Sequence, residues 1–511
     1  MAVRILSGTC SNFSGKIIEV EVNISKGLPV FNIVGLPDVA VKESKDRVRA
    51  AIENSGFQFP LGRITINLAP ADVRKIGSLL DLPIAVAILM ESYQINNPMD
   101  AEFLLIGELS LCGDVKGVSG ALPIIIDGVQ ENIGNYIFPL ENIKECKYIQ
   151  DVNLYPFSSL KQVVSFFKYR DVCPYRFVDE LEEDSNEDYL DFSEIVGQNT
   201  AKRAMVVAAA GHHNIILYGS TGSGKSMLSR AFPSIMPDLS KDEQIENAKI
   251  YSIAGLASDV NFKKAPFRMP HHTVTKIALA GGGNNKSISA GEITLANNGV
   301  LYMDEMLEFK KEVLEILREP LQEGYINLTR LNCNIKMQSK ILLIGSFNIC
   351  PCGQKELSVN LSNKCSCSYN EVKRYLGRLS KAIKDRIDIY NYVPRVKYED
   401  IRNEQYELSS KDMKEIVIRV REIQRKRYKN SKYTYNSELQ GKDIFKYCKI
   451  SPRVENILKY YFESACPSLR AYGNVIKLAR TIADIKNNND IKESDVLEAI
   501  EYRKDYNGEI V

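Results

Sequence analysis

The sequence predicts an α/β protein in which a parallel sheet carries a phosphate-binding loop, and three observations support this fold class. The middle of the chain, about 191–395, contains the glycine-rich run GSTGSGKS (219–226) between an apolar, strand-like segment and the start of a helix. Residues 1–165 mix strand-like and helical segments, which is typical of a small α/β or α+β domain. Residues 396–511 have helical periodicity throughout and predict a helical domain.

An acidic linker is expected between the first two parts, over residues 166–190. The stretch VDELEEDSNEDYLDF (178–192) is dense in Asp and Glu and poor in apolar residues, so it cannot bury a core of its own. A solvated linker is one interpretation. A segment that binds a charged partner is the other.

Composition excludes several classes of protein. The 511 residues are 44% hydrophobic and 25% charged, as expected for a soluble chain of two or three domains. The apolar run LPIAVAILM (82–90) is far shorter than the roughly 18 residues of a membrane span, so no membrane partner is expected. A net charge of +2 excludes a globally basic nucleic-acid coat but leaves room for a local basic channel. Eleven cysteines without a signal peptide argue against a disulfide framework and predict a cytoplasmic protein.

The run GSTGSGKS fits the pattern G-x-x-x-x-G-K-[ST] at every fixed position and predicts a site for ATP. Its glycines let the backbone wrap the phosphates, so that successive N–H groups meet negative charge. Lys225 is expected to reach the β- and γ-phosphates, and Ser226 to bind Mg²⁺. The residues expected around the phosphates are Gly219, Ser220, Thr221, Gly222, Ser223, Gly224, Lys225 and Ser226.

Two further strands end in polar side chains suited to hydrolysis. GVLYMDEM (299–306) is an apolar strand that ends in adjacent carboxylates. Downstream of a phosphate-binding loop, Asp304 is expected to hold Mg²⁺ through water and Glu305 to polarise the attacking water. KILLIGSFN (340–348) ends on Asn348, whose amide can orient water near the γ-phosphate. A turn-forming asparagine at a strand end is the alternative interpretation.

Four cysteines gather directly after this strand, in CPCGQKELSVNLSNKCSC (350–367). Four thiolates suit tetrahedral Zn²⁺, and paired cysteines around a short loop are usual at such sites. The one-residue spacer within each pair is less usual than two residues, and free thiols in a reducing compartment are the alternative. The candidate zinc ligands are Cys350, Cys352, Cys365 and Cys367.

Three segments resemble the magnesium-chelatase-type AAA+ ATPases, and more narrowly their ComM/YifB branch: FRMPHHTVTKIALAGGG (267–283), GEITLANNGVLYMDE (291–305) and LREPLQEG (317–324). The resemblance covers almost the whole chain. It implies an AAA+ core over 191–395, a C-terminal helical lid over 396–511, a hexameric ring and ATP hydrolysis, with Asn348 at the sensor-1 position. It also implies action on DNA, as a branch-migration helicase linked to natural competence.

The resemblance carries two arginines over to functional positions. KDRIDI (384–389) is similar to the family's L-L-D-R-I-D segment, which makes Arg386 a candidate arginine finger for a neighbouring subunit's γ-phosphate. Isoleucine and lysine replace the two leucines but leave the arginine in register. SLRAYGNVIKLARTIAD (468–484) is similar to the S-x-R segment of the lid, which makes Arg470 a candidate sensor 2, grouped with the chain's own site residues.

The first domain resembles the Lon-type protease domain that precedes the ATPase in this family. The likeness lies in RKIGSLLDLPIAVAIL (74–89) and GELSLCGDVKGVSGALPIII (107–126). A Lon dyad needs a serine nucleophile and a lysine base, but Leu79 and Leu122 stand at those positions. Ser78 lies one residue from the nucleophile position and still lacks a base. The comparison predicts an inactive scaffold that serves assembly or DNA engagement.

Two segments are candidates for contact with DNA. EGYINLTRLNCNIKMQSK (323–340) predicts a β-hairpin with Arg330 near its tip, where a basic side chain can follow a phosphate backbone; a plain surface hairpin is the alternative. RVREIQRKRYKNSKYTY (419–435) is the most basic stretch, and its tyrosines can stack on unpaired bases. Charge runs on helices are usually solvated faces, which is the other interpretation of this stretch.

These observations favour an ATP-driven ring motor that acts on DNA. A metal-insertion ATPase of the chelatase type is one rival, and the protease-like domain and the cysteine cluster count against it. A nucleotide-dependent remodelling or assembly factor is the other rival. ATP hydrolysis that DNA stimulates separates the first interpretation from both.

Overall fold

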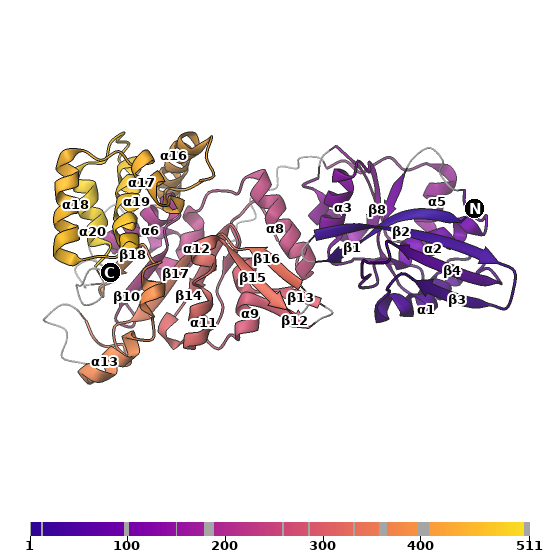
Figure 1. Ribbon diagram of the computed structural model, residues 1–511, viewed down its shortest axis with the longest axis horizontal. Helices are drawn as coiled ribbons and strands as arrows, with labels where there is room; N and C mark the ends of the chain where they lie inside the picture. The colour runs from indigo at the N-terminus through magenta and orange to yellow at the C-terminus, as the bar shows by residue number, and fades with distance from the viewer. Residues whose placement is uncertain are drawn as a thin grey trace. The chain divides into compact units, whose positions relative to one another are not determined.

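The computed structural model describes residues 2–11, 14–96, 102–149, 151–177, 189–257, 260–284, 287–330, 333–356, 365–396 and 408–504. The chain divides into two compact units, coloured from indigo at the N-terminus to yellow at the C-terminus in Figure 1. The first unit comprises Met1–Asp184, Ser240–Phe262 and Gly283–Ala290, and the second Ser185–Leu239, Lys263–Gly282 and Gly291–Val511. No helix within the described segments is long and apolar enough to cross a membrane. Most of the acidic stretch, 178–188, lies outside the described residues.

A seven-stranded mixed sheet forms the first unit, in the order β3-β4-β2-β1-β5-β8-β9. β2 pairs antiparallel with β1 and β4, whereas the other neighbours are parallel. Side-chain alternation buries Ile18, Val20 and Val22 of β2 on one face. The strands are β1 (Val3–Ser11), β2 (Ser14–Ser25), β3 (Val30–Val34), β4 (Arg63–Ala69), β5 (Phe103–Leu105), β8 (Asn135–Pro139) and β9 (Asn153–Phe157), with a short hairpin of β6 (Glu108–Leu109) and β7 (Val115–Lys116).

Two helices of the first unit differ from the expected domain boundaries. α5 continues across the boundary expected at residue 165 because Phe166 and Phe167 pack against Phe103 in the core of this unit. α8 follows the phosphate-binding loop in sequence but packs against α3, where the Gly120 N–H donates to the Ser252 carbonyl at 3.0 Å. The helices are α1 (Val39–Asn54), α2 (Asp81–Glu91), α3 (Ala121–Gln130), α4 (Ile143–Cys146), α5 (Leu160–Tyr169) and α8 (Lys241–Ala254).

A five-stranded parallel sheet forms the centre of the second unit, in the order β11-β14-β17-β10-β18. Every residue of β10 and β14 is buried, which explains why these strands read as continuous apolar runs in the sequence. The parallel-sheet core expected from the motifs is confirmed. The strands are β10 (Ile215–Gly219), β11 (Phe267–Arg268), β14 (Gly299–Met303), β17 (Ile341–Asn348) and β18 (Ile389–Tyr392).

Short helices and one small hairpin belong to the same unit as this sheet. The hairpin expected over 323–340 is confirmed, since β15 and β16 pair antiparallel from Tyr325 with Gln338 to Arg330 with Cys333. The strands of this hairpin are β15 (Tyr325–Arg330) and β16 (Cys333–Gln338). A second pair of short strands, β12 (Gly281–Asn284) and β13 (Ser287–Ala290), belongs largely to the first unit, which includes Gly283–Ala290. The helices are α6 (Asn199–Gly211), α7 (Lys225–Ala231), α9 (Lys276–Ala280), α10 (Glu292–Leu295), α11 (Lys311–Ile316), α12 (Pro320–Glu323), α13 (Tyr369–Leu376) and α14 (Lys381–Lys384).

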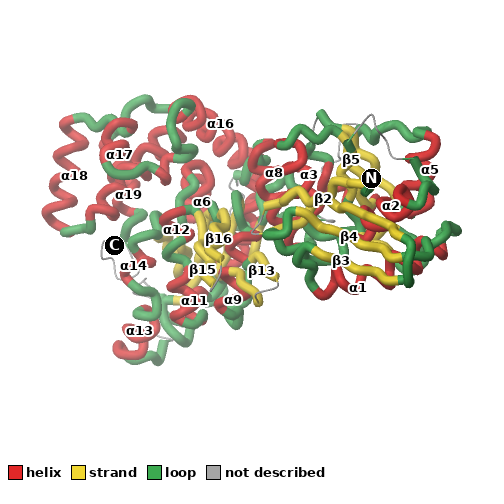
Figure 2. Tube along the Cα trace, turned by 45° about the vertical axis from the view of Figure 1, so that its right-hand side comes forward, coloured by secondary structure: helices red, strands yellow, loops and turns green. Residues whose placement is uncertain are grey.

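The C-terminal region is helical, as predicted, and Figure 2 shows α16 to α19 as a group of red helices. α16 packs on α6, and Gln424 of α16 donates to the Ala210 carbonyl of α6 at 2.8 Å. His213 joins the start of β18 to α19, with its ring nitrogens 3.3 Å from Asp388, which precedes β18, and 2.8 Å from Thr481 of α19. The helices are α16 (Ser410–Tyr428), α17 (Lys442–Tyr447), α18 (Pro452–Ala465), α19 (Leu469–Ile485) and α20 (Glu493–Glu501).

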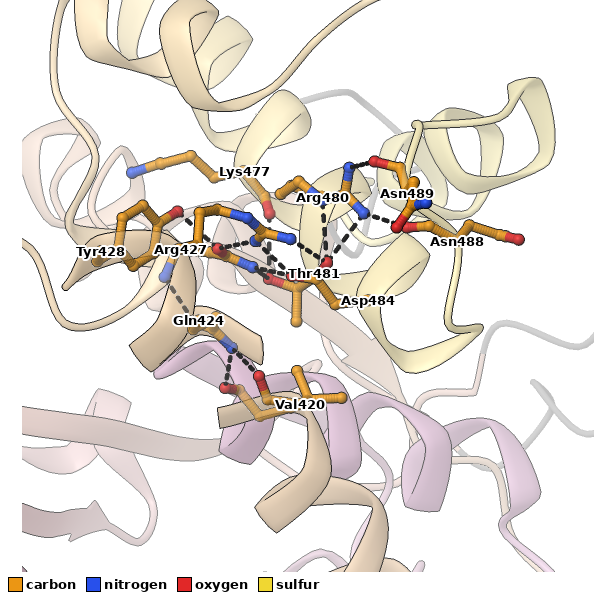
Figure 3. Close-up of polar contacts among 12 residues, drawn as sticks. Val420, Gln424, Arg427, Tyr428, Lys477, Arg480, Thr481, Asp484, Asn488 and Asn489 are labelled. Atoms are coloured by element: carbon orange, nitrogen blue, oxygen red, sulfur yellow. Dashed lines mark hydrogen bonds and ion pairs between the residues drawn. The ribbon is translucent and has the colours of Figure 1, made fainter. Parts of the chain in front are cut away.

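A buried ion-pair network fixes α19 against α16 (Figure 3). Asp484 accepts hydrogen bonds from Arg427 at 2.6 and 2.7 Å, from Arg480 at 3.1 Å and from Asn436 at 3.0 Å. The side chains of Asp484 and Arg480 are 1% and 2% exposed, so water cannot replace these partners. This carboxylate therefore adds a polar tie between α16 and α19, the helix that begins just before Arg470, to the apolar packing of α19 in the core.

Asp484→Ala should destabilise the helical C-terminal region strongly, because it leaves the buried Arg480 and the partly buried Arg427 without their carboxylate. We expect the free energy of unfolding to fall by about 3–5 kcal/mol, measured by chemical denaturation. Lys459→Ala is the matched control, since its pair with Glu463 on α18 is 72% and 65% exposed and should contribute little. Equal stability of the two variants would contradict the importance of the network.

Candidate functional site

Parallel strand pairing brings the predicted motifs to one edge of the second-unit sheet. Gly219, which begins the phosphate-binding loop, pairs with Asn348 at the end of β17. Asp304 directly follows Met303, the last residue of β14, which pairs with Gly345 of β17. In open α/β sheets, ligands bind outside the carboxyl ends of the strands, which is this edge. The structure thus gathers three separate motifs into one candidate site.

The phosphate-binding loop turns at two glycines. Gly222 has φ 75° and Gly224 has φ 95°, both in the left-handed region that glycine adopts without strain. At neither position would a Cβ meet any other part of the protein within 4 Å. Backbone conformation, not crowding, therefore requires glycine here, and the loop leaves open space beside its N–H groups.

Lys225 lies folded into this loop. Its ammonium group donates to the carbonyl oxygens of Gly219 at 3.2 Å and Ser220 at 2.7 Å, and to Asn348 Oδ1 at 3.2 Å. Burial disfavours the charged form and lowers the pKa of Lys225 to about 8, although the carboxylates of Asp304 and Glu305 act in the opposite direction. The ammonium group is thus placed where phosphate oxygens can replace its carbonyl partners.

Hydroxyl groups hold Asp304 as a carboxylate. Ser226 Oγ lies 3.2 Å from Asp304 Oδ2, and Ser346 Oγ donates to Oδ1 at 2.5 Å. Burial alone would raise the pKa of Asp304, but hydrogen bonds from Ser346, Tyr302 and Ser226 outweigh it and lower the pKa. A serine hydroxyl beside an ionised carboxylate is the ligand pair expected for Mg²⁺ in a phosphate-binding site.

Glu305 has a different environment from the neighbouring aspartate. Its side chain is exposed, and its backbone has φ 49°, an uncommon conformation for a residue other than glycine. The Glu305 N–H donates to Ser346 Oγ at 3.3 Å, so the same serine orients both carboxylate residues. Strained backbone of this kind is concentrated at functional sites. A solvent-accessible carboxylate beside a metal-binding one can take a proton from water.

Three residues that support the candidate site were not found from the sequence. Ser346 was signalled only by a polar residue inside the apolar strand KILLIGSFN. Glu356, which is 5% exposed, accepts a hydrogen bond from Ser220 Oγ at 3.0 Å and pairs with Arg395 Nε at 3.0 Å. Nothing in the sequence singles out Glu356 or Arg395, because they meet the loop only through the fold.

Arg386 and Arg470 lie apart from the phosphate-binding loop. Arg386 donates to the carbonyl oxygens of Arg318 at 3.0 Å and Ala382 at 2.6 Å, and it also bonds to Gln322. Burial, and then the positive charges of Arg470 and Arg318, lower the pKa of Arg386, so the three arginines form one cationic cluster. Among the described residues, neither candidate arginine bonds to the loop or to the carboxylates after β14. Arg470 therefore lies near Arg386. The expectation that Arg470 acts in the site of its own chain stays a prediction, because no contact among the described residues supports it.

The four candidate zinc ligands come together. All four sulfur atoms lie within 4.8 Å of one another, and those of Cys350, Cys352 and Cys365 are 3.4 to 3.6 Å apart. Zinc–sulfur bonds of about 2.3 Å in a tetrahedron would place the sulfurs about 3.8 Å apart. The spacing of these thiols therefore fits a tetrahedral ion of this size.

The dyad positions of the first unit hold buried leucines. Leu79 and Leu122 are 5% and 0% exposed, as expected for core side chains rather than reactive groups. Ser78 hydrogen-bonds to the Glu108 carboxylate, and the buried Lys75 bonds to the Pro70 carbonyl. The absence of proteolysis remains a prediction.

Much of the basic stretch at 419–435 binds other parts of the second unit. Arg421 donates to the Ala209 carbonyl at 2.8 Å, and Arg427 donates to the Asp484 carboxylate at 2.6 Å. Arg425 and Lys426 are exposed, so only part of the charge run faces solvent. The side chain of Arg330 at the hairpin tip lies outside the described residues.

Comparison with known proteins identifies the class. A family model described as magnesium chelatase, subunit ChlI, matches residues 191–401, its C-terminal counterpart matches 407–503, and a model for subunit ChlI of Mg-chelatase matches 20–142. The chain is 36% identical over 497 residues to the competence protein ComM of Haemophilus influenzae, covering 95% of this chain and 94% of that protein. The chain belongs to the ComM/YifB-type magnesium-chelatase-like AAA+ ATPases.

Other relatives show where the similarity is concentrated. The protein YifB of Salmonella typhimurium is 36% identical over 493 residues, covering 95% of this chain and 94% of that protein. The magnesium-chelatase 38 kDa subunit of Cereibacter sphaeroides is 27% identical over 173 residues, which cover 31% of this chain and 52% of that protein. The full-length relatives therefore share the whole domain arrangement, and the chelatase subunit shares only part of it.

ATP affinity should decrease as the pH rises through 8. Lys225 has a pKa of about 8 without nucleotide, and bound phosphates favour its cation, so binding takes up a proton above that pH. We expect the dissociation constant of a non-hydrolysable ATP analogue to rise by about tenfold between pH 7 and pH 9. Calorimetry in two buffers of different ionisation enthalpy would detect the proton. An affinity that is constant over this range would contradict the environment described for Lys225.

Proposed function

We propose that the chain is the subunit of an ATP-driven ring motor that moves DNA, by branch migration or strand unwinding. The observation that carries this proposal is the convergence of Lys225, Ser226 and Asp304 at the strand ends of a magnesium-chelatase-like core. The full-length similarity to a protein named for competence supports DNA as the substrate.

ATP and Mg²⁺ fit the residues at this site. Ser226 and Asp304 would hold Mg²⁺, which when bound neutralises charge on the phosphates. Lys225 would exchange its carbonyl partners for the β- and γ-phosphates. Glu305 would accept the proton of the attacking water, and Asn348, released from Lys225, would orient that water.

A second subunit would complete the site. Arg386 and Arg470 share a cationic cluster away from the loop of their own chain, so both are candidates to reach a neighbour's γ-phosphate. A guanidinium supplied in this way stabilises the charge of the transition state. Hydrolysis would then require assembly, and a hexameric ring follows from the family resemblance.

DNA would be contacted without reading of the bases. The β15–β16 hairpin and the exposed Arg425 and Lys426 are the candidate surfaces, because basic side chains can follow a phosphate backbone. The first unit would act as a scaffold without proteolysis, since leucines occupy the dyad positions. A metal-insertion ATPase remains a second candidate on the partial similarity to a magnesium-chelatase subunit.

We also propose that the cysteine cluster binds Zn²⁺. The support is the packing of four sulfur atoms within 4.8 Å at a spacing suited to tetrahedral zinc. Such a site would be structural, because all four ligands come from the protein and no position is left for water or substrate.

DNA should stimulate ATP turnover, which neither rival function requires. The measurement is the steady-state rate of phosphate release with single-stranded DNA, duplex DNA, a four-way junction, or no DNA. We expect the highest rate with the junction and little stimulation in the Glu305→Gln variant. Turnover that no DNA changes would favour a remodelling or chelatase-type function.

Mixed subunits should test whether Arg386 acts on a neighbour. Arg386→Ala keeps an intact loop, whereas Lys225→Ala keeps an intact Arg386, so neither variant alone should hydrolyse ATP. Mixing them creates interfaces with one complete site, and activity should return clearly above background, because such an arginine contributes about 10³-fold or more. Failure to recover activity in mixed oligomers, verified by native mass measurement, would indicate that each chain has a self-contained site.

A further inference from the structure

The segment after β17 connects the cysteine cluster to the phosphate-binding loop. Gly353 directly follows Cys352, and its carbonyl oxygen accepts hydrogen bonds from the Thr221 N–H at 2.8 Å and the Thr221 hydroxyl at 3.0 Å. Three residues later, Glu356 accepts from Ser220 Oγ at 3.0 Å. Two consecutive loop residues are thus held by a segment that begins within the cysteine cluster.

An arginine after the last strand closes this connection from the other side. Arg395 donates to Ser220 Oγ at 3.1 Å, to the Thr221 carbonyl at 3.3 Å and to Gln354 Oε1 at 3.1 Å. It also pairs with the buried Glu356. The loop and the cysteine segment therefore share one set of hydrogen bonds.

Gly353 approaches Thr221 so closely that the contact depends on the exact position of the Gly353 backbone. Gly353 has φ 71°, and a Cβ at this residue would lie 2.6 Å from Thr221 Cγ2. A real Cβ cannot occupy that space, so the backbone approaches the loop more closely than any other residue type allows. A small displacement of Gly353 would move or release Thr221.

The position of Gly353 depends on the cysteine cluster, because Gly353 directly follows Cys352 in the same turn. Cys350 is fully buried, and its sulfur accepts the Lys355 N–H at 3.3 Å, which closes the segment into a turn. Cys352 is exposed, and without a metal only weak sulfur hydrogen bonds join it to Cys350 and Cys365. Bonds to a shared metal ion would fix the turn far more firmly.

We propose that Zn²⁺ bound by the four cysteines sets the ATP affinity of the site, by holding Gly353 and Glu356 against Thr221 and Ser220. The inference rests on the zinc site proposed above and adds that the metal acts on the nucleotide site rather than on stability alone. Without the metal the turn is free to move, and the two loop residues lose their hydrogen-bond partners. Part of the free energy of ATP binding is then used to order the loop, so the affinity for ATP falls. We expect the affinity for ATP to fall about tenfold, which corresponds to about 1.4 kcal/mol.

The test compares the full-length protein before and after metal removal. Zinc is removed by a chelator that is then dialysed away, and Zn²⁺ alone is restored to one sample. The dissociation constant of a fluorescent, non-hydrolysable ATP analogue is measured in excess Mg²⁺, together with zinc content and far-ultraviolet circular dichroism. We expect about one zinc per chain, an affinity about tenfold lower without zinc, full recovery with Zn²⁺, and unchanged helix content.

Gly353→Ala tests the contact between the cysteine segment and the phosphate-binding loop without removing the metal. This variant should keep its zinc and still bind the analogue about tenfold more weakly, because the new Cβ displaces Thr221. Gly324→Ala is the matched control, since Gly324 also has φ 71° but a Cβ there meets only Lys340 Cγ at 3.5 Å. It places alanine at the same φ without the clash and should bind the analogue as the unmodified protein does.

The outcomes distinguish the two proposals. Purified protein without zinc, which also fails to take up Zn²⁺, would overturn both the zinc site and its action on ATP binding. Stoichiometric zinc whose removal leaves the affinity unchanged would overturn only the connection. Equal affinity of Gly353→Ala and Gly324→Ala, with zinc retained in both, would likewise overturn it.

Discussion

The register of β17 with its two neighbours is the constraint on which the ATP site depends. Pairing with β10 places Asn348 beside the loop that carries Lys225, and pairing with β14 places Ser346 beside Asp304. A shift of one residue would turn every side chain of β17 to the other face. The amide and the serine would then leave the site together. Side chains on both faces of β17 are buried, so such a shift would force each of them into packing shaped for another residue.

Hydrogen bonds around this edge give each charged group a distinct role. Ser346 and Ser226 keep Asp304 ionised, while burial weakens the hold of Lys225 on its proton. Glu305 stays in contact with solvent in a left-handed conformation. The chain thus presents an ionised carboxylate suited to a metal ion, a cation suited to phosphate and a carboxylate accessible to water, and its arginine cluster makes no bond to these groups within the described residues. Asp484 binds Arg427 of α16 and Arg480 of α19, so the helix on which Arg470 lies is tied to α16.

The sequence predicted the parts of the fold and site that local patterns encode. Apolar strands β10, β14 and β17 end in GSTGSGKS, Asp304 and Asn348, so their motifs located them without a structure. The hairpin of β15 and β16 and the helical C-terminal region followed from periodicity in the same way. The cysteine pairs were visible from spacing, although their approach to within 4.8 Å was not.

Long-range contacts were beyond the reach of these patterns. Glu356 and Arg395 support the loop across distant parts of the chain, and neither belongs to a recognisable motif. α8 joins the first unit because its packing against α3 overrides its position in the sequence. The charge run at 419–435 gave no sign that Arg421 and Arg427 are bound internally, because a salt bridge to Asp484 depends on tertiary structure.

The claim that this site binds and hydrolyses ATP through separate groups is tested most directly by comparing nucleotide binding with turnover in two variants. Glu305→Gln leaves Lys225, Ser226 and Asp304 in place, so ATP should bind with near-normal affinity while turnover is almost abolished. Lys225→Ala removes the phosphate-binding cation, so binding itself should be lost. Equilibrium binding of labelled ATP and phosphate release, measured on the same preparations, give both quantities. Equal nucleotide affinity in the two variants, or normal turnover in Glu305→Gln, would contradict the account.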